Sequence, residues 1–241
     1  MTTALRIENL TFTYDGKKNV LEGISLDILK GEKVALIGPN GAGKSTFITM
    51  LNGIRTGTGS IVINGNEVST KNLRKVRSEI GIVFQSPDDQ LFCPTVFDDI
   101  AFGPLNYGLN KEVINERISE ALENVGLKNY ENRVIHELSF GEKKLVSIAT
   151  VLSMQPSIIA FDEPTSNLDP LHRRKVINWI NSKENLTILL ATHDLDMVID
   201  TCDRVIILSG GVVAADGTVE EILTNKELLE ANNLELPLSK Q

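Results

Sequence analysis

The stretch that decides the fold is Gly38-Pro39-Asn40-Gly41-Ala42-Gly43-Lys44-Ser45. It fits the pattern G-x-x-x-x-G-K-[ST], in which glycines let the backbone curl so that successive N–H groups face phosphate oxygens. The lysine of this pattern reaches the outer phosphates of a nucleotide, and the serine hydroxyl can bind Mg²⁺. The apolar run Val34–Ile37 precedes the loop and the helical pattern Lys44–Asn52 follows it, which is the context that the pattern requires. The stretch therefore predicts a phosphate site at a helix N-terminus.

A second pattern is the pair of carboxylates Asp162 and Glu163, which follows the apolar run Ile158–Phe161. This run is expected to be a buried strand, and open α/β sheets bind ligands at the carboxyl ends of their strands. Taken alone, an acidic pair after a strand is more often a turn or a helix cap. Combined with the phosphate loop, it predicts that Asp162 holds a metal ion through water and that Glu163 orients or deprotonates the attacking water.

Short apolar runs alternate with longer helical patterns along the chain, which is typical of an α/β protein with a largely parallel sheet. We expect one domain, residues 1–241, with a mixed sheet, an N-terminal antiparallel β subdomain and an inserted helical subdomain over about 86–155. A helical tail over about 218–241 is expected to begin at the capping box of Thr218 and Glu221. Further expected elements are antiparallel strands in 5–14, strands at 60–64, 81–84, 187–192 and 204–208, and helices at 113–125 and 140–154.

The composition limits the possible functions. With 41% apolar and 23% charged residues, the 241-residue chain has ordinary globular usage, and its net charge of −8 argues against a nucleic-acid partner. The basic stretch Lys71–Arg77 is expected to be a solvated helix face. Cys93 and Cys202 are expected to be reduced thiols. We see no secretory signal and no uncharged apolar run near the ~20 residues of a membrane span, and therefore expect a soluble chain that reaches a membrane through a partner.

Several further segments, in the correct order, resemble the motifs of ABC ATP-binding subunits, and the resemblance spans nearly the whole chain. The segment 138–142, Leu-Ser-Phe-Gly-Glu, resembles the signature motif, and 166–169, Ser-Asn-Leu-Asp, resembles the D-loop. Gln85 resembles the Q-loop glutamine, His193 the switch histidine, and Tyr14 the aromatic residue that stacks on adenine. The resemblance implies a P-loop NTPase of the ABC ATPase type, with ATP and Mg²⁺ as its ligands.

In ABC proteins the signature helix of a second subunit closes the nucleotide site, so the resemblance implies a homodimer or a heterodimer with a paralogous ATPase. The implied catalytic residues are Lys44, Gln85, Glu163 and His193. The implied metal ligands are Ser45, Gln85 and Asp162. The implied nucleotide contacts are Tyr14, Gly38, Pro39, Asn40, Gly41, Ala42, Gly43, Lys44, Ser45, Thr46, Ser139, Gly141 and Asp169.

The chain departs from the family pattern at three positions. Phe140 replaces the usual glycine of the signature, Glu142 replaces glutamine, and Leu145 stands where many members have arginine. Ser139 and Glu142 also form a Ser-x-x-Glu capping box, which predicts that a helix begins there. His172, like His136, matches no motif and is expected to be an ordinary structural side chain.

The segment Phe84–Asn106 closely resembles ATPases of energy-coupling-factor importers, especially those for cobalt and nickel ions, and Ile148–Met154 fits the same subgroup. The resemblance implies a transmembrane coupling subunit and a substrate-capturing membrane subunit, bound near Ser86–Asn106 at the cytoplasmic face of the cell membrane. An importer of a vitamin is the alternative. The adjacent acids Asp88 and Asp89 either pair with arginines of the coupling subunit or form a solvated turn.

Three other classes of protein fit the sequence less well. A non-transport ABC ATPase acting on ribosomes or DNA usually carries tandem domains or a long coiled-coil insertion, and neither is present. A P-loop kinase or GTPase leaves the signature and His193 unexplained, and the Asn-Lys-x-Asp motif of GTPases is missing. An inactive binding module is disfavoured because no active-site position is degenerate.

Overall fold

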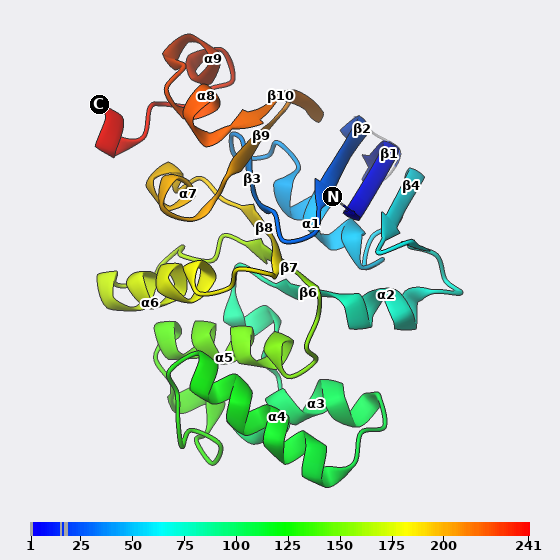
Figure 1. The fold of residues 1–241 in the computed structure, drawn as a ribbon, viewed down its shortest axis with the longest axis vertical. Helices are drawn as coiled ribbons and strands as arrows, with labels where there is room; N and C mark the ends of the chain where they lie inside the picture. Colours follow the sequence, from blue (N-terminus) through cyan, green and yellow to red (C-terminus); the bar gives the residue numbers. More distant parts are fainter. Residues whose placement is uncertain (1, 15, 17–18) are drawn as a thin grey trace. The chain divides into compact units, whose positions relative to one another are not determined.

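The computed structural model describes residues 2–14, 16 and 19–241, which divide into two compact units (Figure 1). The first unit contains Met1–Ile82, Ser157–Glu163 and Glu184–Gln241, and the second contains Val83–Pro156 and Pro164–Lys183. The insert expected at about 86–155 lies within the second unit, which also includes residues 164–183 that no sequence pattern assigned to it. None of the helices in the described part of the chain is both long enough and apolar enough to span a bilayer.

The larger sheet of the first unit has the strand order β10-β9-β3-β8-β7-β6. Strand β3 pairs in parallel with β8 and β9, and β7 pairs in parallel with β8, whereas β10 is antiparallel to β9. The carboxyl ends of β3, β7 and β8 therefore meet at one edge of the sheet, where α/β proteins bind ligands. The strands are β3 (Lys33–Ile37), β6 (Ile80–Val83), β7 (Ile158–Asp162), β8 (Thr187–Ala191), β9 (Arg204–Ser209) and β10 (Val212–Thr218).

The smaller sheet of the first unit is antiparallel, with the order β2-β1-β4-β5. The stretch 5–14 forms one long strand and not several, and its partners are β2 and β4. Strand β2 was not predicted, because its alternation is interrupted at Gly23, which has a φ of 65°. The strands are β1 (Thr3–Thr13), β2 (Asn19–Leu29), β4 (Thr58–Ile63) and β5 (Asn66–Glu67).

The helices of the first unit are mostly short. The basic stretch Lys71–Arg77 falls largely on α2, and its four cations are exposed, as expected for a solvated face. The capping box of Thr218 and Glu221 is present at the start of α8, as predicted. The elements are α1 (Lys44–Leu51), α2 (Leu73–Glu79), α7 (Leu195–Thr201), α8 (Val219–Leu223), α9 (Lys226–Ala231) and a 3-10 turn (Leu238–Lys240).

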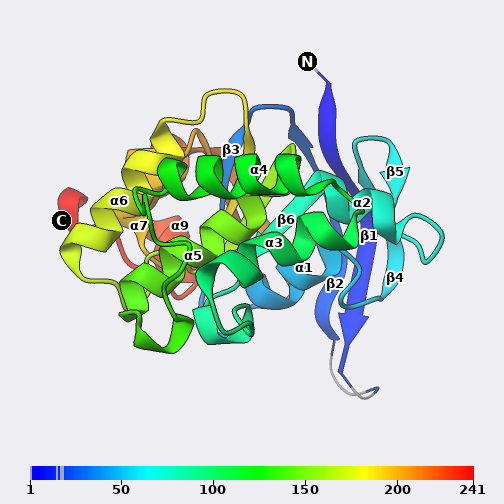
Figure 2. The ribbon, with the colours of Figure 1, turned by 90° about the horizontal axis from the view of Figure 1, so that it is seen from below.

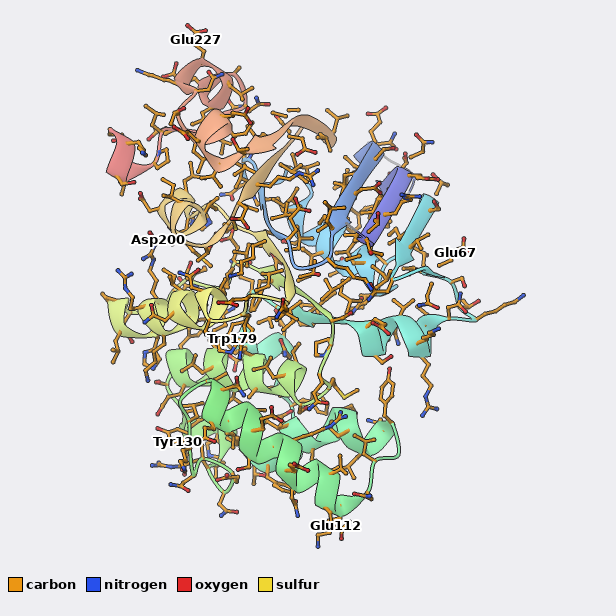
Figure 3. All side chains as sticks on the ribbon, viewed as in Figure 1. Glu67, Glu112, Tyr130, Trp179, Asp200 and Glu227 are labelled. Carbon is orange, nitrogen blue, oxygen red and sulfur yellow. The ribbon has the colours of Figure 1, made fainter. Side chains whose placement is uncertain are left out.

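The second unit is helical, and α3, α4 and α5 pack against one another (Figure 2). Helix α4 buries Ile114, Ile118 and Leu122 at helical spacing, and Glu112 in its first turn is exposed (Figure 3). Leu145, which stands where the family has arginine, is 1% exposed, so it contributes to the core of the unit. The helices are α3 (Val96–Asn106), α4 (Lys111–Asn124), α5 (Phe140–Leu152) and α6 (Pro170–Asn181), with 3-10 turns at Pro87–Asp89 and Ile135–Glu137.

Candidate nucleotide site

The phosphate loop connects β3 to α1, and two of its glycines are required by the surroundings. Gly38 has a φ of 153°, and a Cβ there would collide with the carbonyl oxygen of Leu208. Gly43 caps α1 with a φ of 102°, and a Cβ there would lie 2.8 Å from the side chain of Leu21. The loop can therefore take this path only with glycine at both positions.

Lys44 is almost buried, and its ammonium group lies over the loop itself. It donates hydrogen bonds to the carbonyl oxygens of Gly38 at 2.7 Å and Pro39 at 3.2 Å. Burial lowers the pKa of the Lys44 ammonium, and the carboxylates of Glu163 and Asp162 oppose that shift. The positive charge is thus held at the loop beside the acidic pair.

The hydroxyl of Ser45 donates a 3.0 Å hydrogen bond to Oδ1 of Asp162, which is 7% exposed. The pair thus brings a hydroxyl and a carboxylate oxygen together beside the phosphate loop, and oxygen atoms are the ligands that Mg²⁺ takes. Among the described residues no cluster of three or more His, Cys, Asp or Glu side chains could hold a metal by itself. A magnesium ion here would therefore also need phosphate oxygens and water, which is its usual mode of binding.

Glu163 is held by the end of strand β8. Its Oε1 lies 2.9 Å from Nδ1 of His193, and its Oε2 accepts hydrogen bonds from Oγ1 of Thr192 at 3.1 Å and from the backbone N–H of His193 at 3.4 Å. The φ of Glu163 is 47°, an unfavourable value for a residue with a side chain, and such values concentrate at functional sites. Glu163 is nearly buried whereas the His193 ring is 64% exposed, so the pair joins a fixed carboxylate to a solvent-facing imidazole.

Tyr14 lies beside the start of α1. Its hydroxyl is 3.0 Å from Oγ1 of Thr46, and its ring packs edge-on against Phe12. The guanidinium carbon of Arg55 lies 4.8 Å from the ring centroid, and Tyr14 remains 41% exposed. The first unit thus gathers the phosphate loop, the acidic pair, His193 and Tyr14.

The other expected site residues, Gln85, Ser139, Gly141 and Asp169, belong to the second unit. Ser139 caps α5 through the predicted capping box, in which Glu142 accepts 2.8 Å hydrogen bonds from the N–H and the hydroxyl of Ser139. These bonds, with a third from the hydroxyl of Tyr130, hold the pKa of Glu142 below its usual range. The replacement of glutamine by glutamate therefore strengthens the start of this helix.

Asp169 caps α6, a helix that the sequence analysis missed although Asp169-Pro170 is a recognised start signal. Oδ1 of Asp169 accepts the N–H groups of Leu171 and His172, and Oδ2 lies 2.6 Å from Nδ1 of His172. The backbone and side-chain hydrogen bonds from His172 lower the pKa of the Asp169 carboxyl. His172 was expected to have no particular role, and its position three residues after the cap was the signal that could have suggested one.

Gln85 follows β6, and its backbone is tied to α5 by Lys144, which is fully buried. The ammonium group of Lys144 donates to the carbonyl oxygens of Phe84 at 2.9 Å and Gln85 at 2.7 Å. The side chain of Gln90 accepts a 3.1 Å hydrogen bond from the N–H of Phe84 and donates a 2.8 Å hydrogen bond to the carbonyl oxygen of Ser147. Neither side chain stands out in the sequence, since lysine and glutamine are mostly exposed residue types.

Asp88 and Asp89, expected to face the coupling subunit, differ in their surroundings within the chain. The carboxylate of Asp88 forms a 2.7 Å ion pair with Lys143 of the same chain, so it already has a cationic partner. Asp89 is exposed and remains the acid of this pair that is available to a separate chain.

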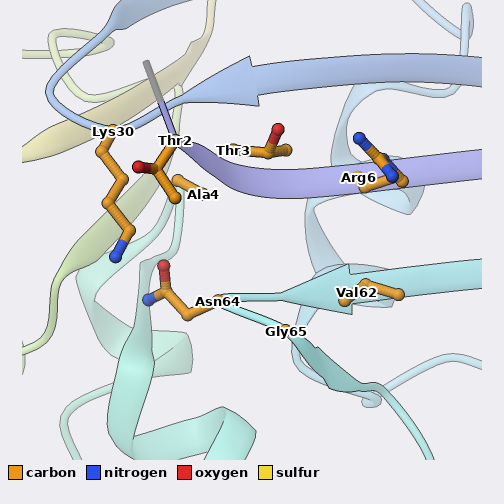
Figure 4. Close-up of a pocket in the computed structure, with 8 residues that line it drawn as sticks. All are labelled: Thr2, Thr3, Ala4, Arg6, Lys30, Val62, Asn64 and Gly65. Carbon is orange, nitrogen blue, oxygen red and sulfur yellow. The ribbon is translucent and has the colours of Figure 1, made fainter.

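Two hollows of the first unit lie outside the predicted site or at its margin. One, of about 400 Å³, is lined by side chains of β1 together with Lys30 and Asn64, and contains none of the predicted site residues (Figure 4). The other, of about 410 Å³, lies between His193 and the terminal segment 233–238. No local sequence pattern indicates that the tail lies beside His193.

Comparison with known proteins identifies the family. The family described as "ABC transporter" matches residues 21–166, which includes the phosphate loop, the signature and the acidic pair. The chain belongs to the ABC transporter family. As an ABC ATPase it binds ATP and hydrolyses it.

Relatives and solved structures extend this result. The ABC ATPase is 44% identical to the energy-coupling factor transporter ATP-binding protein EcfA of Methanothermobacter thermautotrophicus, over 97% of this chain and 76% of the relative. It is 41% identical to EcfA1 of Methanospirillum hungatei, over 97% and 86%. The structure of cbiO1 from Clostridium perfringens, part of the ABC transporter complex cbiONQ, matches with a TM-score of 0.83 and 37% identity, over 97% and 95% of the chains.

A second structural match is the dimeric ATP-binding cassette MJ0796 bound to ADP and Pi, with a TM-score of 0.80 and 26% identity over 89% of this chain and 98% of that one. These matches confirm the predicted P-loop NTPase fold and the resemblance to energy-coupling-factor ATPases. The kinase and GTPase alternatives are thereby excluded.

Proposed function

We propose that this ABC ATPase drives an importer of the energy-coupling-factor type, most specifically one for cobalt or nickel ions. The two units act in this proposal as one ATP-binding domain. The observation that carries the ATPase mechanism is Glu163, a nearly buried carboxylate fixed by Thr192 and His193 at the sheet edge that also holds the phosphate loop. The importer assignment draws on the EcfA relatives and on the cbiO1 match.

In the proposed reaction, the loop N–H groups, the N-terminus of α1 and Lys44 hold the phosphates of ATP. Glu163 accepts a proton from the attacking water or orients it, and His193 fixes the position of Glu163. Ser45, Gln85 and, through water, Asp162 would hold Mg²⁺, which supplies positive charge to the transferring phosphoryl group. Tyr14 would stack on adenine.

We further propose that two chains bind two ATP molecules between them, head to tail, either as a homodimer or with a paralogous ATPase. Ser139 and Gly141 of one chain would close the site formed by the phosphate loop of the other, and Asp169 would approach the same site. Two observations support this arrangement: the signature serine caps a helix whose N–H groups suit a γ-phosphate, and the matched cassette MJ0796 is dimeric.

The region proposed to bind the membrane partner carries exposed apolar side chains. Phe92 is 67% exposed, Phe102 48% and Leu105 59%, and the two phenylalanine rings pack edge-on with centroids 4.9 Å apart. Exposed apolar side chains gathered in this way mark interaction sites. They lie within the segment Ser86–Asn106, which supports docking of a coupling subunit there and a location at the cytoplasmic face of the membrane.

Glu163→Gln tests the ATPase mechanism, because it keeps the size of the side chain and removes its charge and basicity. We expect kcat to fall about 10²–10⁴-fold, the usual contribution of a general base, while ATP binding persists and ATP-bound dimers accumulate. Size-exclusion chromatography with ATP and a phosphate-release assay measure the two effects. Glu67→Gln is the matched control, since Glu67 is an exposed glutamate of the same unit (Figure 3). Turnover within twofold of wild type would refute the role of Glu163.

Phe102→Ser tests the membrane partner. We expect the variant to lose co-purification with multi-spanning membrane proteins of the host and to keep its basal ATPase activity. Ile54→Ser, at an equally exposed apolar residue of the first unit, is the control and should keep both. Uptake of labelled cobalt or nickel by cells that express the complex then tests the cargo. Vitamin uptake in place of metal uptake would reject the metal assignment alone.

A further inference from the structure

We propose that His172 is a positioning residue, which keeps the signature glycine Gly141 and the D-loop aspartate Asp169 of one chain at a fixed separation. This inference rests on the proposed ATP sandwich, because only there do both elements meet the same nucleotide of a partner chain. All three residues lie in the second unit, so their contacts are internal to it.

The first contact joins His172 to the signature. A Cβ added to Gly141 would lie 2.5–2.8 Å from three atoms of the His172 ring, namely Cγ, Nδ1 and Cδ2. The ring therefore packs directly on the backbone of Gly141. Gly141 belongs to α5 and does not have a left-handed φ, so it is the ring and not the backbone conformation that requires glycine here.

The second contact joins His172 to the D-loop. Nδ1 of the ring lies 2.6 Å from Oδ2 of Asp169, and the backbone N–H of His172 donates to Oδ1 at 3.0 Å. Both carboxylate oxygens of Asp169 are thus held by the same residue. The His172 side chain is only 16% exposed, so the ring is confined between the aspartate and the glycine.

The contact between His172 and Gly141 continues to a carboxylate on the next residue of α5. Beyond Gly141 lies Glu142, whose carboxylate accepts hydrogen bonds from the hydroxyls of Ser139 and Tyr130. The caps of α5 and α6 are therefore joined through one imidazole. A displacement of the D-loop would carry the signature with it, and the two elements would reach or leave the partner's nucleotide together.

The caps themselves do not need the ring. Ser139 keeps its capping box with Glu142, and Asp169 keeps the N–H of Leu171, when the His172 side chain is removed. Loss of the ring is therefore expected to alter closure of the dimer and not the fold of either helix. Nucleotide binding to a single chain is expected to stay unchanged, because the phosphate loop, the acidic pair and Tyr14 all lie in the first unit.

Three substitutions separate the two contacts. His172→Asn keeps an N–H donor toward Asp169 and loses most of the ring, His172→Phe keeps the ring and loses the donor, and His172→Ala loses both. His136→Ala is the control, since His136 is an exposed histidine of the same unit that matches no motif. Each is made in the active chain and also together with Glu163→Gln, in which ATP-bound dimers accumulate.

We expect His172→Ala to lower kcat about tenfold and to weaken ATP-induced dimerisation about tenfold, as for loss of one charge-assisted hydrogen bond with its packing. Binding of a fluorescent ATP analogue to the single chain should stay within twofold. His172→Asn and His172→Phe should each lose less of kcat and of dimerisation than His172→Ala. ATP-induced dimerisation of His172→Ala like that of wild type would overturn the inference. So would kcat and dimerisation of His172→Asn and His172→Phe that are both no higher than those of His172→Ala. If wild type and His136→Ala themselves fail to dimerise with ATP, the proposed sandwich fails instead.

Discussion

Replacing Lys144 by methionine removes a fully buried ammonium group from α5 and leaves the carbonyls of Phe84 and Gln85 without that donor. Hydrogen bonds to charged groups contribute about 1.5–3 kcal/mol each, so the two bonds together account for roughly 3–6 kcal/mol. The change also removes the desolvation cost of the ammonium, and methionine retains the packing of the apolar stem. We therefore expect a net loss of about 2–3 kcal/mol.

That loss corresponds to a fall in the apparent Tm of roughly 4–12 °C for a chain of this size, measured by calorimetry or circular dichroism. Because the lost bonds hold the backbone of Gln85, kcat should fall as well, while ATP binding to the single chain should not change. Lys143→Met is the matched control at the adjacent lysine, whose ion pair with exposed Asp88 is worth about 0–1 kcal/mol. Equal unfolding temperatures for the two variants would refute this reasoning.

Two further predictions follow from the glycine and glutamate positions. Gly38→Ala should abolish ATP binding and lower stability by about 1–3 kcal/mol, because its Cβ collides with the Leu208 carbonyl, as ATP titration and thermal unfolding would measure. Gly65→Ala is the control for backbone strain without a collision, since Gly65 has a φ of 79° and nothing lies within 4 Å of a Cβ there; it should keep ATP binding. The pKa of Glu142 is lower in the folded chain than in the unfolded one, so its stabilising effect is present above the unfolded pKa near 4.5 and is lost as pH falls through the folded value. Glu142→Gln should therefore unfold more readily than wild type at neutral pH and equally readily at the acid end, and a difference that grows below pH 4 would contradict this.

The parts of the site that sequence could predict are those fixed by local chemistry. The phosphate loop, the acids after β7 and the box of Ser139 and Glu142 each depend on residues within a few positions of one another, and the structure has them where expected. Lys143 and Lys144 show what local sequence patterns could not predict. They are identical neighbours in the sequence, yet one forms a surface ion pair and the other is buried against the Q-loop backbone.

The difference between the two lysines depends on which face of α5 packs against the segment after β6. This is a tertiary contact, which local sequence patterns do not predict. His172 was missed for the same reason, since its ring matters only because Gly141 of another helix packs on it. Strand β2 and helix α6 were missed for a different reason. Alternation in β2 is interrupted at Gly23, and α6 has a start signal at Asp169-Pro170 but only a short apolar stripe, so the periodicity of both is weak.

The position of Lys44 bears on how the phosphate loop keeps its shape. Its ammonium group has three N–H donors, so it can bond the carbonyls of Gly38 and Pro39 and also donate to a phosphate oxygen. The bonds to Gly38 and Pro39 lie within the loop and stabilise its curled conformation. The same ammonium group thus supports the shape of the loop and supplies a positive charge for the phosphates of ATP, so both depend on one side chain.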